Sequence, residues 1–480
     1  MAQQPPQAAQ ADNIFLSGPL GALFARTAIP IIFVMGMNGL QTVIDAYFVG
    51  EFVGSQALAA VTLMFPVFML MIALSTLVAN GMTSVLARQL GANELAQARQ
   101  TLTSAQVLAL VVCGALIGGF AFGGHALVDR LANGSDALAR LGYTYISILI
   151  WCSPSSFLMS IHGDALRSEG RVGFMALSSL SVSLANICFN YLLIVVLDRG
   201  VAGSAEGTVL AQLAALATVF VYRGMGKSRL GMGWSSSPGG WTRGWTGGWT
   251  GGWGSYLALG APQSLSFVGI SLGTTAIILA VQIWNPDNYA ATVAAYGIVL
   301  RMLTFAYLPL LGLSMSMQTL VGNNYGAQLW HRSNAGLRLA LVVSLIYGAA
   351  IQIIVLLFRR QLGFIFVDDA SSAAEVARIM PMMTAMYFAA GPILMLSAYF
   401  QAVGDAGRSA IISLTRTYVF AIPLTFTLPF VFGETGIWYA GPAAELAMIA
   451  LAAVLLAQTR LAKGHRWGLF RHSDPAQTRG

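Results

Sequence analysis

Charged residues are scarce in this sequence of 480 residues. Asp, Glu, Lys and Arg make up 9% of the chain and hydrophobic residues 56%, whereas about a quarter of an ordinary soluble domain is charged. Long uncharged runs, such as 52–87 and 172–197, separate short charged islands. Each run is long enough for a transmembrane helix, which needs about 20 apolar residues, and none alternates in polarity as a barrel strand does. The sequence therefore excludes a soluble globular protein and predicts an all-α polytopic membrane protein.

Cysteine and histidine are also rare. The three cysteines, Cys113, Cys152 and Cys188, lie inside apolar runs and have neither metal-ligand spacing nor a paired partner. The five histidines lie at the ends of apolar runs or between them. We therefore expect no metal and no cofactor. Because no nucleophile is paired with a base, we also expect no intramembrane enzyme.

Charges, Gly and Pro clusters and the loss of apolar character predict twelve transmembrane helices. Their expected ranges are 23–48, 57–83, 101–123, 141–163, 172–196, 201–222, 257–283, 290–316, 335–358, 378–400, 410–432 and 436–460. An even number of spans places both termini on one side. Of the 25 basic residues, 17 fall on that side and six on the other, with two inside spans. The positive-inside bias predicts that both termini are cytoplasmic. The net charge of +7 then reflects topology and gives no reason to expect a nucleic-acid partner.

The longest loop divides the helices into two sets of six. The expected organisation is a cytoplasmic N-terminal tail (1–22), an N-lobe (23–222), a cytoplasmic linker (223–256), a C-lobe (257–460) and a cytoplasmic C-terminal tail (461–480). The N-terminal tail lacks the features of a cleavable signal. The linker repeats tryptophan every four residues among Gly and Thr, at Trp241, Trp245, Trp249 and Trp253. Two interpretations remain, a flexible Gly-rich linker or a tether to the membrane interface or a partner.

The two halves of the sequence resemble each other. The matched segments are Ala28-Ile29-Pro30 with Gly260-Ala261-Pro262, Ala59-Ala60 with Ala294-Ala295, Arg88-Gln89-Leu90-Gly91-Ala92 with Asn323-Asn324-Tyr325-Gly326-Ala327, and Ser168-Glu169-Gly170-Arg171 with Gly404-Asp405-Ala406-Gly407-Arg408. Both halves begin on the same side, so the repeat is parallel. Two pseudo-symmetric six-helix lobes around a central cavity form an architecture that supports alternating access.

An ordered set of motifs from about residue 20 to residue 460 carries a resemblance to a known family. The motifs are Ile29-Pro30, Val43-Ile44-Asp45-Ala46-Tyr47-Phe48-Val49-Gly50, Ala57-Leu58-Ala59-Ala60-Val61, Phe65-Pro66, Leu166-Arg167-Ser168-Glu169-Gly170, Asn186 and Gly200-Val201-Ala202-Gly203. In these residues the sequence resembles the multidrug and toxic compound extrusion (MATE) transporters, and most closely their DinF-like branch. The resemblance implies export of organic compounds driven by an inward proton or sodium gradient.

Asp45 is the acid that stands out within the first predicted span. A carboxylate inside a span is costly unless it faces a cavity or a partner, so it is a functional candidate by default. Desolvation disfavours its ionised form, which lets such a group exchange a proton near neutral pH. Gln41 lies one helical turn earlier on the same face. Asn186 and Asn190 in the fifth span have the same spacing, and Thr208 and Glu206 lie near the outer end of the sixth span. These side chains fall at similar depth, which predicts one polar cluster in the N-lobe.

The resemblance implies that positions like Asp45, Asn186, Asn190 and Thr208 form a cation and proton site, with the aspartate as the proton carrier. Many relatives have an aspartate where this chain has Asn190, so Glu206 is a candidate replacement acid. However, residues 206 and 208 point to opposite sides of a helix. Sodium-coupled relatives resemble one another in having acids in the seventh and tenth spans, which are absent from 257–283 and 378–400 here. We therefore expect protons as the coupling ion and keep Na⁺ as an alternative.

Two further charges lie inside predicted spans of the C-lobe. Arg301 in the eighth span and Glu445 in the twelfth lie at similar depth, so we expect an ion pair between them. Such a pair is either structural or able to exchange partners with substrate or proton. Arg416 lies nearer the cytoplasmic end of its span and is expected to reach the interface by snorkelling.

The sequence as a whole predicts a proton-coupled multidrug efflux antiporter in a bacterial inner membrane. Its expected partners are small organic compounds, most simply amphipathic cations, and the lipid bilayer, and the expected oligomeric state is a monomer. Two alternatives remain, sodium-coupled efflux and a lipid-linked oligosaccharide flippase. Flippase relatives resemble one another in lining the cavity with several basic residues, whereas Arg301 and Arg416 are the two intramembrane arginines expected here.

Overall fold

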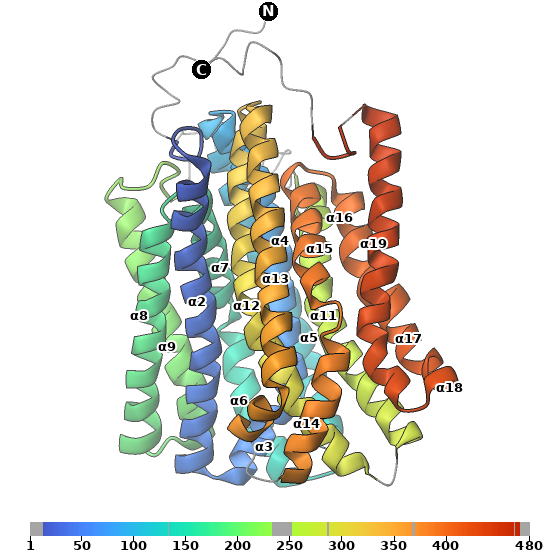
Figure 1. Ribbon diagram of the computed structural model, residues 1–480. Helices are drawn as coiled ribbons and strands as arrows, with labels where there is room; N and C mark the ends of the chain where they lie inside the picture. Colours follow the sequence, from blue (N-terminus) through green and yellow to red (C-terminus); the bar gives the residue numbers. More distant parts are fainter. Residues whose placement is uncertain are drawn as a thin grey trace, which may run out of the picture. The chain divides into compact units, whose positions relative to one another are not determined.

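The computed structural model of the chain describes residues 13–132, 134–232, 252–285, 288–366, 370–464 and 466–470. Within these residues the regular elements are helices (Figure 1). The chain divides into two compact units. Unit 1 comprises Met1–Ser17 and Ile29–Ser264, and unit 2 comprises Gly18–Ala28 and Leu265–Gly480. The N-terminal tail up to residue 12, the linker residues 233–251 with Trp241, Trp245 and Trp249, and the C-terminal tail from 471 lie outside the described residues.

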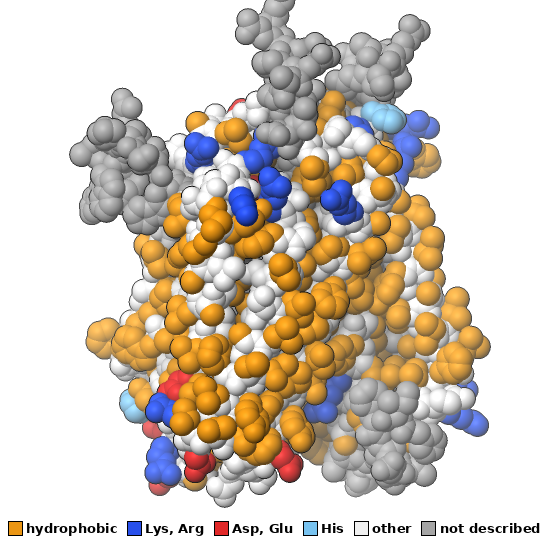
Figure 2. Space-filling model, turned by 90° about the vertical axis from the view of Figure 1, so that its left-hand side faces the viewer, with side chains coloured by type: hydrophobic (Ala, Val, Ile, Leu, Met, Phe, Trp, Pro, Cys, Tyr) orange, Lys and Arg blue, Asp and Glu red, His pale blue; other side chains and the backbone are white. Residues whose placement is uncertain are grey.

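The helices confirm the predicted all-α membrane architecture. Among the described residues, ten helices are long and apolar enough to cross a membrane, and the number rises to twelve if each of two bent pairs is one span. Large apolar side chains lie exposed along them, including Leu357, Phe430 and Val431 at 68%, 78% and 74% exposure. On the face drawn in Figure 2, hydrophobic side chains cover the middle of the helices, while Lys and Arg gather mainly toward the helix ends. A surface of this kind suits contact with lipid tails.

Unit 1 contains the first six spans. Its helices are α2 (Leu20–Phe48), which begins in unit 2, η1 (Val49–Val53), α3 (Ser55–Leu63), α4 (Phe65–Gly91), α5 (Leu95–Leu131), α6 (Asp136–Trp151), α7 (Ser153–Ser168), α8 (Val172–Asn190), η2 (Tyr191–Val196) and α9 (Gly200–Gly224). The elements η1 and η2 are short π-helices. The pair α6 and α7 bends by 49° and forms the fourth span.

Unit 2 contains the other six spans. Its helices are α11 (Trp253–Trp284), whose first turns lie in unit 1, α12 (Tyr289–Gly326), α13 (Trp330–Phe366), α14 (Ala370–Met383), α15 (Tyr387–Ala402), α16 (Ala406–Leu414), η4 (Thr415–Ala421), α17 (Ile422–Thr427), α18 (Pro429–Phe432) and α19 (Thr435–Lys463). The π-helix η4 interrupts the eleventh span. The tenth span is bent by 50° between its two helices.

The second and tenth spans differ from the prediction. The expected helix 57–83 is two helices, because the chain breaks at Met64 and Pro66 opens α4. A proline fits the first turn of a helix, where its missing N–H needs no partner. The tenth span was expected to begin at 378 and to contain no acid. The structure begins its apolar helix pair at Ala373, so the span includes Glu375, which pairs with Arg378.

Two glycines bring α4 and the first turns of α11 into close contact within unit 1. A Cβ added at Gly81 would lie 1.9 Å from the carbonyl oxygen of Tyr256, and one added at Gly260 would lie 1.8 Å from that of Leu77. Any larger residue would force the backbones apart. Small residues commonly allow this approach between membrane helices.

One side chain satisfies the backbone at the break between α14 and α15. Gln352 of α13 donates to the carbonyl oxygen of Ala385 at 2.7 Å and accepts the N–H of Phe388 at 3.2 Å. Backbone polar groups at membrane depth need partners within the protein. The break is therefore a stabilised feature of unit 2.

Candidate functional site

A chain of polar contacts surrounds Asp45 in unit 1. Asn190 donates from Nδ2 to Asp45 Oδ1 at 2.6 Å and to Asn186 Oδ1 at 3.3 Å. Asn186 donates in turn to Thr208 Oγ1 at 3.0 Å, and the Thr208 hydroxyl donates to the carbonyl oxygen of Ser204 at 3.1 Å. The structure thus brings together the aspartate, both asparagines and the threonine that were predicted to share one depth.

The helices explain why these residues meet. Asn186 and Asn190 lie one turn apart on α8, which packs along α9 (Figure 1). Gly207 of α9 makes room for the amide, since a Cβ there would lie 2.4 Å from Asn190 Oδ1. The π-helix η2 begins directly after Asn190, and η1 begins four residues after Asp45. π-Helical turns are rare and often occur at functional sites.

The partners of Asp45 are more deeply buried than Asp45 itself. Asn186 and Asn190 are both 0% exposed, while Asp45 and Thr208 are partly exposed. The Oδ1 atom of Asn190 is buried and has no hydrogen-bond partner among the described residues. The cluster therefore presents an accessible carboxylate on a rigid amide support.

Tyr145 of α6 is a neighbour that the sequence did not indicate. It lies within electrostatic range of Asp45 and packs against an apolar cluster of Val49, Ala57 and Val201. An aromatic residue within an apolar span has no distinguishing sequence signal, because most such residues pack against lipid or core.

Gln41 and Glu206 are placed differently from Asp45. Gln41 has no hydrogen bond to the cluster in the described structure, and its Oε1 accepts the Ser183 hydroxyl of α8 at 3.3 Å instead. Glu206 is directed to the end of the span, where it pairs with Arg199. The hydrogen bond from Arg199 to Glu206 raises the pKa of Arg199 above its usual value. Glu206 and Thr208 point to opposite sides of α9, which is why Glu206 has no contact with Asp45 in the described structure.

The predicted pair between Arg301 and Glu445 is wrong. Glu445 of α19 pairs instead with Arg416, whose Nε lies 2.6 Å and whose Nη2 lies 2.5 Å from Glu445 Oε1. The Arg301 side chain is exposed. Depth along a span gives the height of a residue but not which helix lies beside it, and α19 packs against η4. The expectation that Arg416 has no specific partner is wrong for the same reason.

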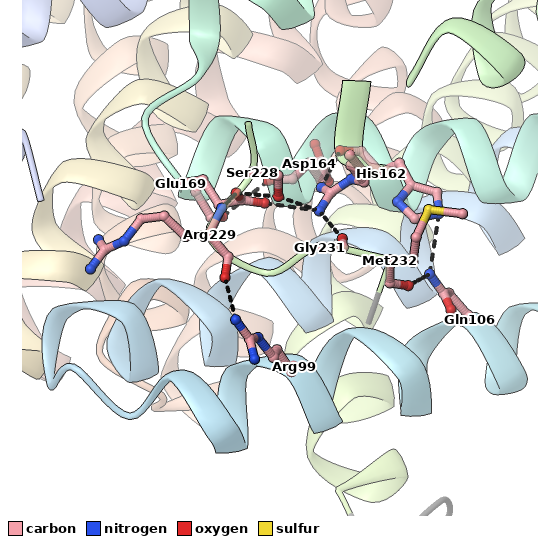
Figure 3. A network of polar contacts seen from close by, with 11 residues as sticks. Arg99, Gln106, His162, Asp164, Glu169, Ser228, Arg229, Gly231 and Met232 are labelled. Carbon is pink, nitrogen blue, oxygen red and sulfur yellow. Dashed lines mark hydrogen bonds and ion pairs between the residues drawn. The ribbon is translucent and has the colours of Figure 1, made fainter. Parts of the chain in front are cut away.

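A second buried network of polar side chains lies in unit 1, near residues 223–232 (Figure 3). Arg223 Nη1 lies 3.0 Å from Glu169 Oε1, and both side chains are 0% exposed. Glu169 Oε2 accepts the Ser228 hydroxyl at 2.6 Å and the backbone N–H of Arg229 at 2.9 Å. Arg223 also donates to the carbonyl oxygen of Gly231 at 2.9 Å. The first residues of the expected linker are therefore held by α7 and α9.

His162 and Gln106 extend this network. The Nε2 atom of His162 lies 3.1 Å from Gln106 Nε2, and the Gln106 amide reaches the carbonyl oxygen of Met232 at 3.5 Å (Figure 3). The sequence predicted that Glu169 and Arg223 lie in loops. The one indication of a role for Glu169 was its place in the motif Leu166-Arg167-Ser168-Glu169-Gly170. In the described chain, no group of three or more His, Cys, Asp and Glu side chains could hold a metal ion.

The sequence and the fold are both similar to those of known proteins. A family profile described as MatE matches residues 30–192 and 262–427. The chain is 23% identical to the probable multidrug resistance protein YoeA of Bacillus subtilis, over 87% of this chain and 89% of that protein. It is 22% identical to the multidrug export protein MepA of Staphylococcus aureus, over 92% of this chain and 94% of that protein.

Solved structures share the fold. A multidrug resistance MATE family transporter of the MOP superfamily, in an outward-facing conformation, matches with a TM-score of 0.82 at 20% identity over 96% of this chain and 99% of that one. A MATE crystal structure in the bent conformation matches with a TM-score of 0.82 at 21% identity over 95% and 98%. The first profile segment contains Asp45, Asn186 and Asn190 and ends before Thr208. The second contains Arg416 and ends before Glu445.

Proposed function

The chain belongs to the MatE family of multidrug efflux transporters, and on that premise we propose that it couples the export of organic compounds to the entry of protons by alternating access. Asp45 carries the proton. The observation that supports this role is the contact of its carboxylate with Asn190, on a helix otherwise free of acidic residues. Because an asparagine cannot titrate, the described cluster offers one carboxylate for the proton.

Protonation of Asp45 changes the contact that joins α2 to α8. The bond from Asn190 to the ionised carboxylate is charge-assisted, and such bonds are roughly twice as strong as neutral ones. A proton on Asp45 removes that charge and weakens the bond. The π-helices η1 and η2, which follow the two residues and contact each other, are the segments that we expect to rearrange.

The contacts of the cluster favour a proton over Na⁺. A hard cation is held by several oxygen ligands, whereas a proton needs one basic group. The oxygen of Asn186 already accepts an N–H from Asn190, and that of Thr208 accepts one from Asn186. Each of these oxygens has a second lone pair, but Na⁺ would have to share the oxygen with its N–H donor, and among the cluster's amide oxygens that of Asn190 is the one without a donor in the described residues.

The remaining parts of the proposal concern substrate and location. We propose amphipathic organic cations as substrates, a bacterial inner membrane with both termini in the cytoplasm, and a monomeric transporter. Membership of the DinF-like branch belongs to the same proposal. The excess of basic residues on the side of the termini supports the orientation.

The test uses the full-length protein in liposomes with ethidium as the substrate. An imposed pH gradient should drive ethidium export by the wild-type protein, and Asp45→Asn should stop it because asparagine cannot carry the proton. Glu51→Gln is the matched control, since Glu51 is an exposed acid six residues further along the same span. Gradient-driven export by the Asp45→Asn protein would refute the assigned role of Asp45.

The coupling ion is tested in the same vesicles. A proton gradient without Na⁺ should be sufficient, and a Na⁺ gradient at equal pH should give no export. Export that requires Na⁺ would replace the proton by sodium as the coupling ion.

A further inference from the structure

Arg416 and Glu445 lie deep within the spans of unit 2. Arg416 comes ten residues after Ala406 at the start of its span, and Glu445 comes ten residues after Thr435 at the start of α19. At a rise of 1.5 Å per residue, each lies about 15 Å from the nearer end of its span. Charged residues at this depth are rare and usually serve a function.

The contacts between Arg416 and Glu445 use one oxygen of the Glu445 carboxylate. Both contacts from the Arg416 guanidinium go to Glu445 Oε1, while Oε2 is buried and has no hydrogen-bond partner among the described residues. The contacts described for Arg416 involve Nε and Nη2. Its side chain is 44% exposed, whereas that of Glu445 is 5% exposed. The outer edge of the guanidinium, Nη1 with Nη2, is therefore the edge that Glu445 does not occupy on an exposed side chain.

Tyrosine side chains add polar groups around the pair. Tyr307 of α12 and Tyr387 of α15 both lie within electrostatic range of Arg416 and Glu445. The Tyr387 hydroxyl is buried and has no hydrogen-bond partner in the described part of the chain. A buried hydroxyl without a partner costs free energy. It is therefore a donor that a ligand could satisfy.

Interrupted helices position these groups. Arg416 lies in the π-helix η4, and Tyr387 opens α15 after the 50° break that Gln352 stabilises. In membrane transporters, broken helices near the middle of the bilayer commonly form ligand sites. The two interruptions thus bring Arg416 and Tyr387 together by backbone features that a purely structural ion pair does not need.

The pair lies on the two spans of unit 2 that correspond, in the internal repeat, to two spans of the Asp45 cluster, although not at the same positions along them. Asn186, Asn190 and Thr208 come from the fifth and sixth spans, while Arg416 and Glu445 come from the eleventh and twelfth. In unit 1 the first span adds the carboxylate of Asp45. Its counterpart, α11, contains no acidic residue. Unit 2 thus has a cation on the eleventh span and no acid from the helix that corresponds to α2.

We propose that Arg416 is an anion-binding residue of unit 2 and takes the carboxylate group of an organic acid or zwitterion. The free edge of the guanidinium binds the carboxylate with two parallel N–H bonds, and Tyr387 donates a further hydrogen bond. Glu445 holds the guanidinium by its other edge, and its negative charge competes with that of the ligand for the charge of Arg416. This inference concerns binding alone and does not depend on proton coupling.

The test measures binding of 2-naphthoate by calorimetry to the full-length protein in detergent, with 2-naphthamide as an uncharged probe of the same shape. The wild-type protein should bind naphthoate at least about tenfold more tightly than naphthamide, since the amide lacks the charge that strengthens bonds to Arg416. Glu445→Gln should tighten naphthoate binding by about tenfold, because the competing carboxylate is removed.

The double substitution Arg416→Gln with Glu445→Gln should abolish the preference for naphthoate. It removes both charges together, so no unpaired charge is left inside the span. Arg359→Gln, which removes an exposed arginine of α13, should leave binding unchanged. Each protein is first checked for a single symmetric peak in size-exclusion chromatography.

Three results would overturn the proposal. The first is that the wild-type protein binds naphthoate and naphthamide equally, or binds neither. The second is that Glu445→Gln leaves the affinity for naphthoate unchanged. The third is that the double variant still prefers naphthoate to naphthamide. Asp45→Asn should bind naphthoate as the wild-type protein does. The result of the naphthoate experiment is therefore independent of whether export is coupled to protons.

Discussion

Glu169 in unit 1 and Glu445 in unit 2 are both buried carboxylates paired with an arginine, but their surroundings differ. The carboxylate of Glu169 also accepts bonds from Ser228 and Arg229, and its partner Arg223 is fully enclosed. Glu445 leaves Oε2 without a hydrogen-bond partner in the described structure, and its arginine is 44% exposed. Both oxygens of Glu169 have a polar contact, since Oε1 faces Arg223 and Oε2 accepts two hydrogen bonds, although Oε1 has no hydrogen bond of its own in the described structure. An enclosed pair of this kind stabilises one arrangement, whereas a pair with one oxygen uncontacted and an exposed arginine can exchange partners. The comparison suggests structure for the first pair and ligand binding for the second.

The largest expected effect comes from the enclosed pair. Glu169→Gln leaves Arg223 buried without a counter-charge, which should cost about 3–5 kcal/mol of folding free energy. Thermal unfolding of the purified protein, followed by tryptophan fluorescence, measures the loss. The exposed acid Glu51 provides the control, since Glu51→Gln should leave the unfolding temperature nearly unchanged. An unfolding temperature for Glu169→Gln equal to that of the wild-type protein would end the structural interpretation of this pair.

The Asp45 cluster lies between the two extremes, because its amides are buried and its carboxylate is partly exposed. Gly207→Ala adds a Cβ that would lie 2.4 Å from Asn190 Oδ1, so the amide must turn away from Asp45. A hydrogen bond to a charged group contributes about 1.5–3 kcal/mol, and we expect proton-driven ethidium export to fall by about tenfold or more.

Gly224→Ala is the matched control for Gly207→Ala in the same helix. An added Cβ at Gly224 meets no atom within 4 Å, so export should be unchanged. Equal export by both variants would mean that the geometry of Asn190 does not matter for coupling.

The open pair should be less sensitive than the enclosed pair. Glu445→Gln leaves Arg416 without its counter-charge, but the Arg416 side chain is 44% exposed, so the loss of folding free energy should be smaller than the ~3–5 kcal/mol expected for Glu169→Gln. The same thermal unfolding measurement compares it directly with Glu169→Gln. Equal losses in the two variants would remove the distinction between enclosed and open pairs.

The sequence predicted the helices well because uncharged length alone determines whether a segment can cross a membrane. It also predicted that Asp45, Asn186, Asn190 and Thr208 form one polar cluster, because helical spacing and span depth limit where a polar side chain can find a partner. The same depth argument failed for Glu445. Estimated depth favoured Arg301 as its partner, whereas the packing of α19 against η4 brings Arg416 to it.

Other features of the structure have no signal in a single sequence. A π-helix such as η4 does not alter the pattern of apolar residues, and Tyr145 looks like any other aromatic residue of a span. Glu169 and Arg223 lie near predicted helix ends, where charged residues are usually solvated. Their burial depends on residues 228–232 folding back over the ends of α7 and α9, a long-range contact that local periodicity cannot indicate.

The smallest expected effect separates Glu206 from Asp45 as a proton carrier. Glu206 pairs with Arg199 near the end of the span, with side-chain exposures of 27% and 51%. Such exposed pairs contribute little, so Glu206→Gln should change the initial rate of proton-driven ethidium export by less than about twofold. The rate should also keep its dependence on external pH, because the titrating group is unchanged. A lost or shifted pH dependence in this variant would make Glu206 part of the proton path. It would then replace the acid that Asn190 lacks, and the coupling could no longer be assigned to a single carboxylate.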